Sequence, residues 1–390
     1  MQQPSAAAAT LPASGIREIV NLVVDDPAVR RLEIGEPDAA TPPHILEAAR
    51  RALEGRLGYV QSAGMPVLRE AIRDRLERVS GIQAPLERII VGQGAVQAIA
   101  AVMAAVVGPG DEVLVPDPAW PVYEMQAQLL GARPVRYPLR AENGYLPDPD
   151  ELLALTTPRT RVLVLNSPSN PAGSVAPAAL MERLVRDAAA RGVLVISDEV
   201  YDEMVFDGTH VGAHAFAPDS VVSVFSFSKT YAMTGWRVGY AVVPAPLAVT
   251  LERVQETLLS CVPTIAQHAA LAALQGPQDS VAANRERYRR RRDAAVAQLA
   301  AGGIAAPAPG GAFYLLMPLA PGADSRAAAL DLATRGVSVA PGSAFGDVAR
   351  DVFRLSLGSA DDVLAEGIDR ILAWYGESDG GLRPTREAAR

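Results

Sequence analysis

The segment SFSKTYAMTGWRVGY, residues 226–240, begins where an apolar run typical of a buried strand ends. It contains Lys229, the single lysine of a chain that has 35 arginines. A guanidinium stays charged, whereas a desolvated lysine amine can lose its proton near neutral pH and attack a carbonyl. The hydroxyls of Ser226 and Ser228 and the guanidinium of Arg237 suit a phosphate. The segment therefore predicts a site for a phosphorylated carbonyl ligand. The alternative is a serine-rich turn with a surface lysine, followed by an ordinary strand.

Short apolar runs on either side of this segment indicate its structural setting. They are separated by segments with helical periodicity, and they do not alternate between polar and apolar residues. This pattern predicts an α/β fold with a mostly parallel sheet that is covered on both faces. Ligands of such sheets bind at the carboxyl ends of the strands. The expected strands are residues 88–91, 112–116, 161–165, 193–197 and 221–226, and two expected helices are residues 97–107 and 178–190.

The character of the chain changes after about residue 275. A long arginine-rich helix is expected over residues 284–299, followed by the strand-like GGAFYLLM, a helix over 325–335, short strands near 337 and 353, and a final helix over 361–375. We expect an N-terminal arm and the start of a small domain over 1–45, a large domain over 46–275, and a small α+β domain over 276–375. The polar tail 376–390 is expected to be disordered. The run YRRRRD is interpreted as a solvated helix face.

Composition excludes several classes of protein. A formal charge of −8 argues against nucleic acid or an anionic membrane as a partner. No apolar stretch is long enough for a membrane span, and the start lacks the basic region of a signal peptide. A single cysteine, Cys261, rules out an intrachain disulfide and favours a cytoplasmic location. The four histidines show no ligand spacing, so we expect no metal.

Three further motifs lie where predicted strands end. In GQGAVQAI (92–99), the amides of Gly94 and Ala95 at a helix start could hold a phosphate, although such turns often bind nothing. LNSPSNPAG (165–173) holds Asn170 in a proline-rich turn. In VISDEVYDEM (195–204), Asp198 and Tyr201 follow a buried strand. A buried acid needs a cationic partner, which a pyridinium nitrogen could supply, and the alternative for Asp198 is a helix N-cap.

Together these motifs resemble the fold-type I pyridoxal-phosphate (PLP) enzymes, and specifically the class I/II aminotransferases of the bacterial aspartate-aminotransferase type. The resemblance covers about residues 16–375. It rests on nine motifs in order: LEIGEPDAATPPHI, YVQSAGMPVLREAI, the glycine turn, PGDEVLVPDPAWPVY, NSPSNPAG, SDEVY, SFSKTYAMTGWRVGY, GGAFYLL and FRLSLG.

The resemblance implies a role for each matching residue. Lys229 forms a Schiff base with PLP and later moves the proton between the substrate Cα and the cofactor's C4′. Asp198 pairs with the pyridine nitrogen, while Asn170 and Tyr201 bind the phenolic oxygen. Trp120 stacks on the ring, where the alternative is an ordinary core tryptophan. The implied phosphate ligands are Gly94, Ala95, Ser226, Arg237, the more variable Ser228, and Tyr59 from a partner subunit.

The resemblance also implies how the substrate binds. Arg354 holds the α-carboxylate, helped by the Gly35 backbone and Asn170, where the alternative for Arg354 is a surface charge at a strand edge. Val96 stands where many relatives have a hydroxyl or a lysine after the glycine turn. This difference disfavours a dedicated aspartate enzyme and favours a neutral, aromatic or basic donor, with pyruvate or 2-oxoglutarate as acceptor. The sequence is also similar in style to the arginine–pyruvate branch of the family.

The implied activity is ping-pong transfer of an amino group from an L-amino acid to a 2-oxo acid. The donor and acceptor are small molecules, and the protein is expected to be a homodimer with shared active sites. One alternative is a PLP-dependent lyase, cyclase or oxidase of the same fold, which uses the same cofactor residues. A more remote alternative is a non-enzymatic PLP-binding regulator. Regulators of that kind carry a DNA-binding module before this domain, and about 15 residues precede the resemblance here.

Overall fold

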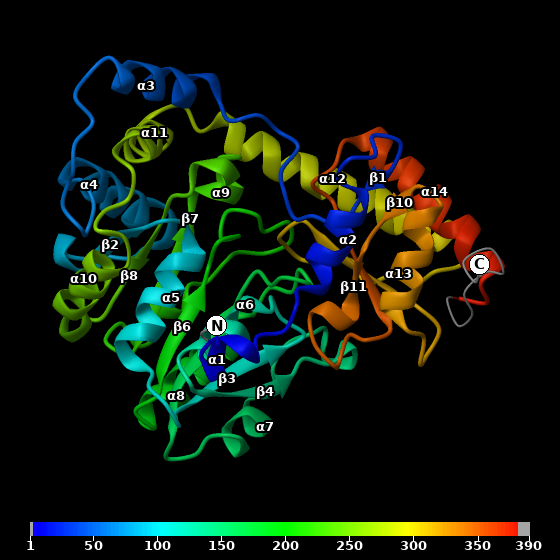
Figure 1. Ribbon diagram of the computed structural model, residues 1–390, viewed down its shortest axis with the longest axis horizontal. Coiled ribbons are helices and arrows are strands. Elements are labelled where there is room, and N and C mark those ends of the chain that lie inside the picture. The colour runs from blue at the N-terminus through cyan, green and yellow to red at the C-terminus, as the bar shows by residue number, and fades with distance from the viewer. Residues whose placement is uncertain (1–2, 381–390) are drawn as a thin grey trace.

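The computed structural model describes residues 3–380, and a seven-stranded sheet lies at its centre (Figure 1). The strand order is β2-β8-β7-β6-β5-β3-β4. All neighbouring pairs are parallel except the two that β8 makes. The predicted mostly parallel α/β sheet is therefore confirmed. The strands are β2 (Ile89–Gly92), β3 (Glu112–Asp117), β4 (Arg133–Pro138), β5 (Thr160–Asn166), β6 (Leu194–Asp198), β7 (Val221–Ser226) and β8 (Gly239–Val242).

Helices cover both faces of this sheet. Successive strand residues point to opposite sides, and since both sets of side chains are buried, each face packs against helices. On one face, Val164 and Ile196 pack with α5 (Ala95–Val106), α6 (Val122–Leu129) and α10 (Ala245–Leu259). On the other face, Leu163 and Val195 pack with α8 (Ala178–Ala190) and α7 (Pro149–Ala154). Near β2 and β8 this second face is covered by α3 (Pro43–Leu53), α4 (Pro66–Arg75) and α11 (Thr264–Gln275).

A second core forms beside the large sheet from both ends of the described chain. An antiparallel sheet, β11-β12-β9, and a short parallel pair, β1-β10, pack with the helices around them. Ile19 and Leu32 from the N-terminal segment belong to this core. The elements are α2 (Gly15–Val23), β1 (Arg30–Arg31), β9 (Tyr314–Pro318), α13 (Ser325–Thr334), β10 (Val337–Ser338), β11 (Ala340–Pro341), β12 (Val352–Ser356) and α14 (Asp361–Glu377), whereas the short helix α1 (Ala6–Ala9) buries no residue.

The domain boundaries at residues 45, 275 and 375 remain predictions. The last helix ends at Glu377, two residues later than expected, and Gly380 O accepts a hydrogen bond from Ala320 N. The first residues of the expected disordered tail are therefore ordered. Residues 381–390 of that tail lie outside the described residues.

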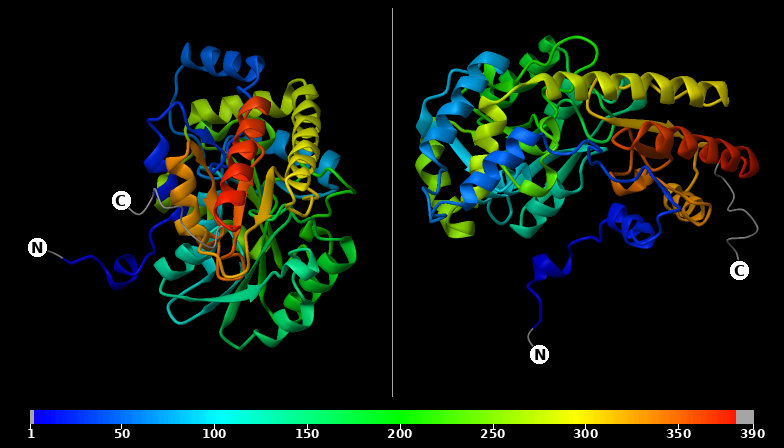
Figure 2. Two further views of the ribbon diagram at one scale, coloured as in Figure 1. Left: turned by 90° about the vertical axis from the view of Figure 1, so that its right-hand side faces the viewer. Right: turned by 90° about the horizontal axis from the view of Figure 1, so that it is seen from above.

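Helix α12 (Asp279–Ala301) links the two cores. Its first turn places Val281 in the core that contains α3, α4 and α11. Further along, Tyr288 and Leu299 are fully buried in the core of the small sheets. Figure 2 shows α12 extending from one region across the other. A single rigid element therefore belongs to both cores.

The interpretation of YRRRRD as a solvated helix face is wrong for two of its arginines. Arg291 and Arg292 are both 6% exposed. Arg291 pairs with Asp38 at 2.7 Å and Asp361 at 2.6 Å, and Arg292 pairs with Asp207. These carboxylates come from distant parts of the chain, so the sequence around residue 291 could not reveal them.

Strand β4 was not predicted from the sequence. It lies at the edge of the sheet, where a proline such as Pro134 does not interrupt hydrogen bonding to a further strand. Within residues 3–380 no helix is both long enough and apolar enough to cross a membrane. Over the same residues, no three His, Cys, Asp or Glu side chains gather as a group able to bind a metal ion.

Candidate active site

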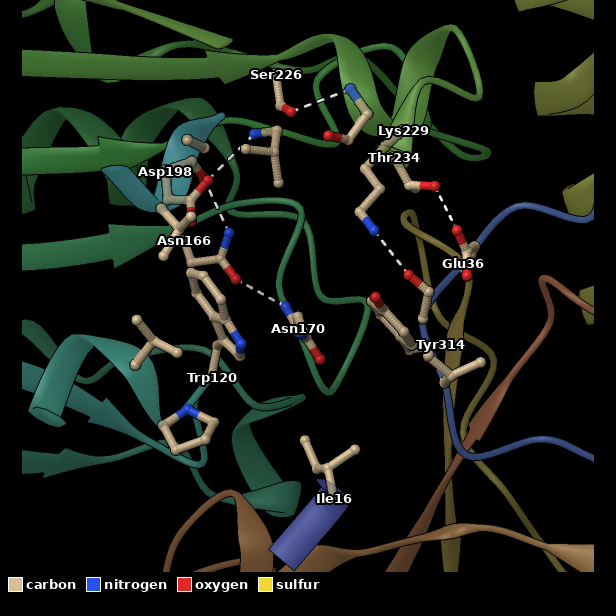
Figure 3. A pocket seen from close by; sticks show the side chains of 18 of the residues that line it. Ile16, Glu36, Trp120, Asn166, Asn170, Asp198, Ser226, Lys229, Thr234 and Tyr314 are labelled. Atoms are coloured by element: carbon tan, nitrogen blue, oxygen red, sulfur yellow. Dashed lines mark hydrogen bonds between the residues drawn. The ribbon is translucent and has the colours of Figure 1, made fainter. Parts of the chain in front are cut away.

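A cavity of about 650 Å³ opens at the carboxyl ends of the central strands, and most of the predicted site residues line it (Figure 3). They reach it from the ends of different strands, as expected for a parallel sheet. Gly94 lies beside the cavity, whereas Tyr59 lies away from it. The predicted residues that line the cavity are Gly35, Ala95, Val96, Trp120, Asn170, Asp198, Tyr201, Ser226, Ser228, Lys229, Arg237 and Arg354.

Lys229 lies on the one-turn helix α9 (Phe227–Thr230) directly after β7. Its Nζ donates a hydrogen bond to Gly35 O at 2.7 Å and points into the cavity (Figure 3). Burial lowers the pKa of Lys229 to about 8, while the Glu36 carboxylate raises it. The neutral, nucleophilic form of this amine is therefore easier to reach near physiological pH than that of an exposed lysine.

Asp198 ends β6 and is 2% exposed. Its Oδ2 accepts a hydrogen bond from Tyr123 Oη at 2.5 Å, and Oδ1 accepts one from Val200 N at 3.3 Å. Burial raises the pKa of Asp198 to about 6, although the Tyr123 hydrogen bond lowers it. A carboxylate with so little solvent is stabilised by a cation, and a protonated ring nitrogen would supply one.

Asn166 holds the two predicted polar residues in place. Its Nδ2 donates to Asp198 O at 2.9 Å, and its Oδ1 accepts from Asn170 N at 2.7 Å. Figure 3 shows the three side by side, next to the ring of Trp120. Trp120 lies edge-on to Tyr123, with the ring centroids 5.5 Å apart.

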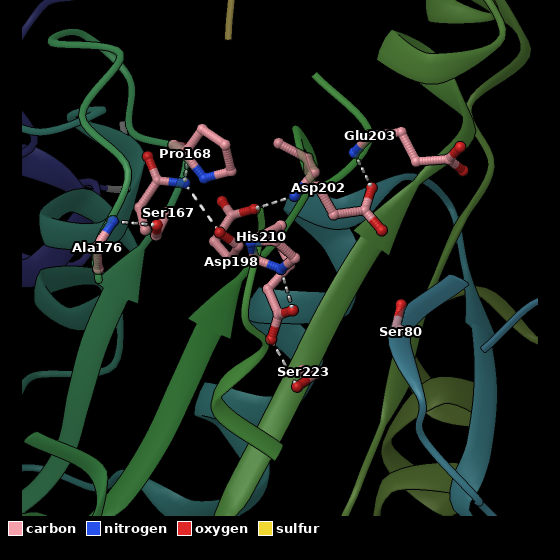
Figure 4. A network of polar contacts seen from close by, with 12 residues as sticks. Ser80, Ser167, Pro168, Ala176, Asp198, Asp202, Glu203, His210 and Ser223 are labelled. Atoms are coloured by element: carbon pink, nitrogen blue, oxygen red, sulfur yellow. Dashed lines mark hydrogen bonds and ion pairs between the residues drawn. The ribbon is translucent and has the colours of Figure 1, made fainter. Parts of the chain in front are cut away.

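A buried polar network anchors the turn that follows Asp198 (Figure 4). Glu199 accepts hydrogen bonds from His210 Nε2 and Ser223 Oγ, both at 2.8 Å. Burial lowers the pKa of His210, but the hydrogen bond and the charge of Glu199 raise it by more, so this pKa lies above its usual value. Arg75 on α4 pairs with Asp202 at 2.5 Å. These bonds tie the turn to β7 and to α4, which fixes the direction of Asp198.

The proposed phosphate end of the cavity lies at the start of α5. The first N–H groups of a helix have no acceptor within the helix. Gly94 has φ +78°, and a Cβ there would lie 2.7 Å from Arg237 Nη2, so this approach requires glycine. Arg237 Nη1 donates to Thr234 O at 2.7 Å, and Ser226 Oγ accepts from Ser228 N at 3.1 Å. A guanidinium, hydroxyls and a helix start therefore lie along the same cavity.

Arg354 on β12 is 2% exposed, and its guanidinium is in contact with polar groups and with two aromatic rings. Its Nη1 donates to Asn170 Oδ1 at 3.2 Å, and its Nη2 donates to Glu33 O. The guanidinium lies over the ring of Tyr314 at 4.5 Å and that of Phe345 at 4.8 Å. Within residues 3–380, its buried Nε has no hydrogen-bond partner. A buried cation with an unused donor suits a carboxylate ligand.

Tyr314 connects three of the predicted residues. Its Oη lies 2.8 Å from Tyr201 Oη, and its ring supports Arg354. A Cβ at Gly35 would lie 2.0 Å from Tyr314 Oη, so Gly35 must lack a side chain for its carbonyl to reach Lys229.

Three residues that shape the site were not singled out from the sequence: Tyr123, Asn166 and Tyr314. All three lie inside motifs that carry the family resemblance, in the segments DPAWPVY, NSPSNPAG and GGAFYLL. The motifs therefore indicated the segments that form the site, but spacing along the chain does not show which neighbour contacts Asp198 or Arg354.

The chain matches the sequence profile of the family described as aminotransferase class I and II over residues 28–371. It belongs to this family. It is 39% identical over 357 residues to the aspartate/prephenate aminotransferase of Thermus thermophilus, covering 89% of this chain and 91% of that protein. It is 40% identical over 346 residues to the arginine–pyruvate transaminase of Pseudomonas aeruginosa, covering 87% and 88%.

Solved structures of class I and II aminotransferases have the same fold. The aspartate aminotransferase of Thermus thermophilus with maleate gives a TM-score of 0.91 at 36% identity, covering 96% of this chain and all of that one. The aromatic aminotransferase of Pyrococcus horikoshii gives 0.87 at 34% identity, covering 93% and 99%. The protein is a PLP-dependent, fold-type I aminotransferase that moves an amino group from an L-amino acid to a 2-oxo acid.

The described residues fit PLP. The cavity has the size of a small-molecule site. It presents a lysine with a lowered pKa, a buried carboxylate, and a helix start beside a guanidinium. These groups match an aldehyde, a basic ring nitrogen and a phosphate in turn.

Proposed function

We propose that this cavity is the aminotransferase active site, with Lys229 as the covalent attachment point of PLP. The observation that supports this most directly is the pairing of a lysine of lowered pKa with a buried carboxylate across one cavity. Asp198 would face the ring nitrogen, Asn170 and Tyr201 the phenolic oxygen, and Trp120 the ring face. The phosphate would lie between the Gly94–Ala95 amides, Ser226, Ser228 and Arg237, with Val96 beside it.

When bound, PLP supplies a carbonyl that captures the amino group and a protonated ring that withdraws electrons from the substrate Cα. Asp198 keeps the ring nitrogen protonated. Arg354 holds the α-carboxylate through its unused donors and so orients the Cα–H bond. Lys229 Nζ then takes that proton and returns it, a type of catalysis that supplies about 10²–10⁴-fold.

The decisive experiment is a set of amino donors mixed with the holoenzyme under single-turnover conditions. We expect conversion of the cofactor to its amino form, followed by formation of a new amino acid when a 2-oxo acid is added. Release of free ammonia or hydrogen peroxide in place of a new amino acid would instead indicate a lyase or an oxidase.

We propose further that the pocket accepts apolar side chains as well as a second carboxylate. Ile16, Val20, Val122 and Met125 form apolar parts of its wall. Of the charged residues in the lining, Glu36 accepts a hydrogen bond from Thr234, whereas Arg17 is exposed and its guanidinium makes no ion pair or hydrogen bond within residues 3–380. A guanidinium at the mouth suits the distal carboxylate of 2-oxoglutarate. A relative named for aspartate supports this proposal.

Replacing Arg17 with alanine should raise the KM for 2-oxoglutarate by about tenfold and leave that for pyruvate nearly unchanged, because one charge-assisted hydrogen bond contributes about 1.5–3 kcal/mol and solvent screens part of it. Steady-state kinetics with both acceptors measures this difference. Arg17→Lys should retain much of the preference, and Arg253→Ala on an exposed part of α10 is the control. Equal changes for the two acceptors would rule out this role.

We also propose a homodimer in which each subunit completes the other's site. Tyr59 is 93% exposed and lies away from the cavity of its own chain. Leu53, Leu57 and Val67, which are close to Tyr59 along the chain, are also exposed, and exposed apolar side chains of this kind suit contact with a partner copy. In this arrangement Tyr59 binds the phosphate held by the partner subunit.

Replacing Tyr59 with phenylalanine should weaken cofactor binding by about 10- to 100-fold, because a hydrogen bond to a charged group contributes about 1.5–3 kcal/mol. The loss of cofactor on dialysis, followed by absorbance, measures the effect, and Tyr375→Phe is the matched control. Light scattering at working concentration should give twice the mass of one chain. A fully active monomer would contradict the proposal.

We further propose a cytoplasmic location. The basis is the single cysteine, Cys261, because proteins of oxidising compartments often rely on disulfides. Fractionation of the native host tests this location.

A further inference from the structure

Asp117, at the end of β3, joins the central sheet to a loop of the smaller sheets. It is 5% exposed, and its side chain does not line the main cavity. Its Oδ2 accepts a hydrogen bond from Asp347 N and its Oδ1 accepts one from Val348 N, both at 3.1 Å. Two residues later, Ala119 N donates to Phe345 O at 2.8 Å. The segment at the end of β3 thus contacts four consecutive residues, 345–348, of this loop.

The loop packs so closely against Asp117 that one of its positions must be glycine. Gly346 has φ +145°, and a Cβ there would lie 2.0 Å from Asp117 Oδ1, so only glycine permits the contact. Arg136 reinforces it, with Nη1 at 2.8 Å from Asp347 Oδ2 and 3.9 Å from Asp117 Oδ2. Arg136 is partly exposed, so its pairing contributes less than the buried bonds of Asp117.

The loop leads directly to Arg354. The Arg354 guanidinium lies over the buried ring of Phe345, 4.8 Å from its centroid, and over the ring of Tyr314, 4.5 Å from its centroid. Tyr314 is fixed by its own strand and by Tyr201, whereas Phe345 lies on the short turn that Asp117 holds. The position of one wall of the carboxylate site therefore depends on Asp117.

We propose that Asp117 is a positioning residue for the substrate α-carboxylate, acting through the 345–348 loop and Phe345 on Arg354. The inference rests on the proposed role of Arg354. It predicts a defect confined to substrates that carry an α-carboxylate.

The test compares an amino acid with the amine that lacks only its carboxyl group, both reacting with the holoenzyme in single turnover. In Asp117→Ala, the KM for the amino acid should rise about 10- to 100-fold, because small misplacement of a binding group costs up to about 10²-fold. The slow reaction of the amine should be unchanged. Asp117→Asn keeps one acceptor and should lie between wild type and Asp117→Ala.

Asp148→Ala is the matched control. Asp148 also accepts two backbone N–H bonds, from Asp150 and Glu151, but it caps the distant helix α7. It should lose stability without changing either reaction. If Asp117→Ala and Asp117→Asn slow the amine and the amino acid equally, or leave both unchanged, the inference is wrong.

Arg354→Lys separates failure of this inference from failure of the proposed function. It should raise the KM for the amino acid more than Asp117→Ala does. If it has no such effect, the assigned role of Arg354 is wrong. If it behaves as expected while both Asp117 variants match wild type, only the role of Asp117 is overturned.

Discussion

Lys229→Ala should lower the rate of amino transfer by about 10⁴-fold or more, the upper limit of what a positioned acid–base group supplies. The variant loses the only lysine amine of the chain, and with it both the covalent attachment of the cofactor and the proton carrier at the substrate Cα. Absorbance of the purified holoenzyme measures the attachment, and single-turnover kinetics measures the rate. Borohydride treatment should label the peptide around residue 229 in wild type and leave the variant unlabelled.

Lys229→Arg distinguishes charge from reactivity. It restores a cation at the same place, but a guanidinium does not lose its proton in this pH range. We expect it to be as inactive as the alanine variant, with the fold retained. Substantial activity in either variant, or borohydride labelling at another site, would exclude Lys229 as the attachment point.

Asp198→Asn should reduce the rate by about 10²- to 10³-fold. Asparagine has nearly the same shape and still accepts the hydrogen bond from Tyr123, but it carries no negative charge. Loss of one partner of a buried ion pair costs about 3–5 kcal/mol, and each 1.4 kcal/mol corresponds to about tenfold in rate. Single-turnover kinetics with a reactive donor, at saturating cofactor, measures this loss.

Tyr123→Phe is the comparison for this variant. It removes the hydrogen bond to Asp198 and retains the carboxylate, so its effect should be much smaller, about tenfold. An Asp198→Asn enzyme as active as wild type would show that the ring nitrogen needs no carboxylate. Equal losses in the two variants would indicate that the hydrogen bond from Tyr123 contributes as much as the negative charge of Asp198.

The central sheet was predictable because its strands are buried on both faces. A continuous apolar run, as at residues 161–165 and 221–226, indicates such a strand without knowledge of its neighbours. Strand β4 was missed because it lies at the edge and contains prolines and arginines. The burial of Arg291 was also missed, since its partners Asp38 and Asp361 are distant along the chain.

The residues that face the site were predictable for a different reason. Lys229, Asp198 and Asn170 lie directly after strands, and the topology of a parallel sheet brings such positions to one edge. Residues that act through these groups were not predictable. Tyr123 contacts Asp198 across 75 positions, and Asp117 contacts Val348 across 231. Their importance follows from contacts that neither composition nor periodicity reveals.

The second core has one consequence for how this enzyme's substrate range could diverge. Ile19 of α2 and Leu355 beside Arg354 belong to the same packed core, together with Tyr288 of α12. A shift of that core would move Arg354, which binds the carboxylate, together with the α2 residues that line the cavity for the substrate side chain. Substitutions in α2 could therefore change which amino acids bind. The residues at the carboxyl ends of the large sheet, where the reaction takes place, would be unchanged.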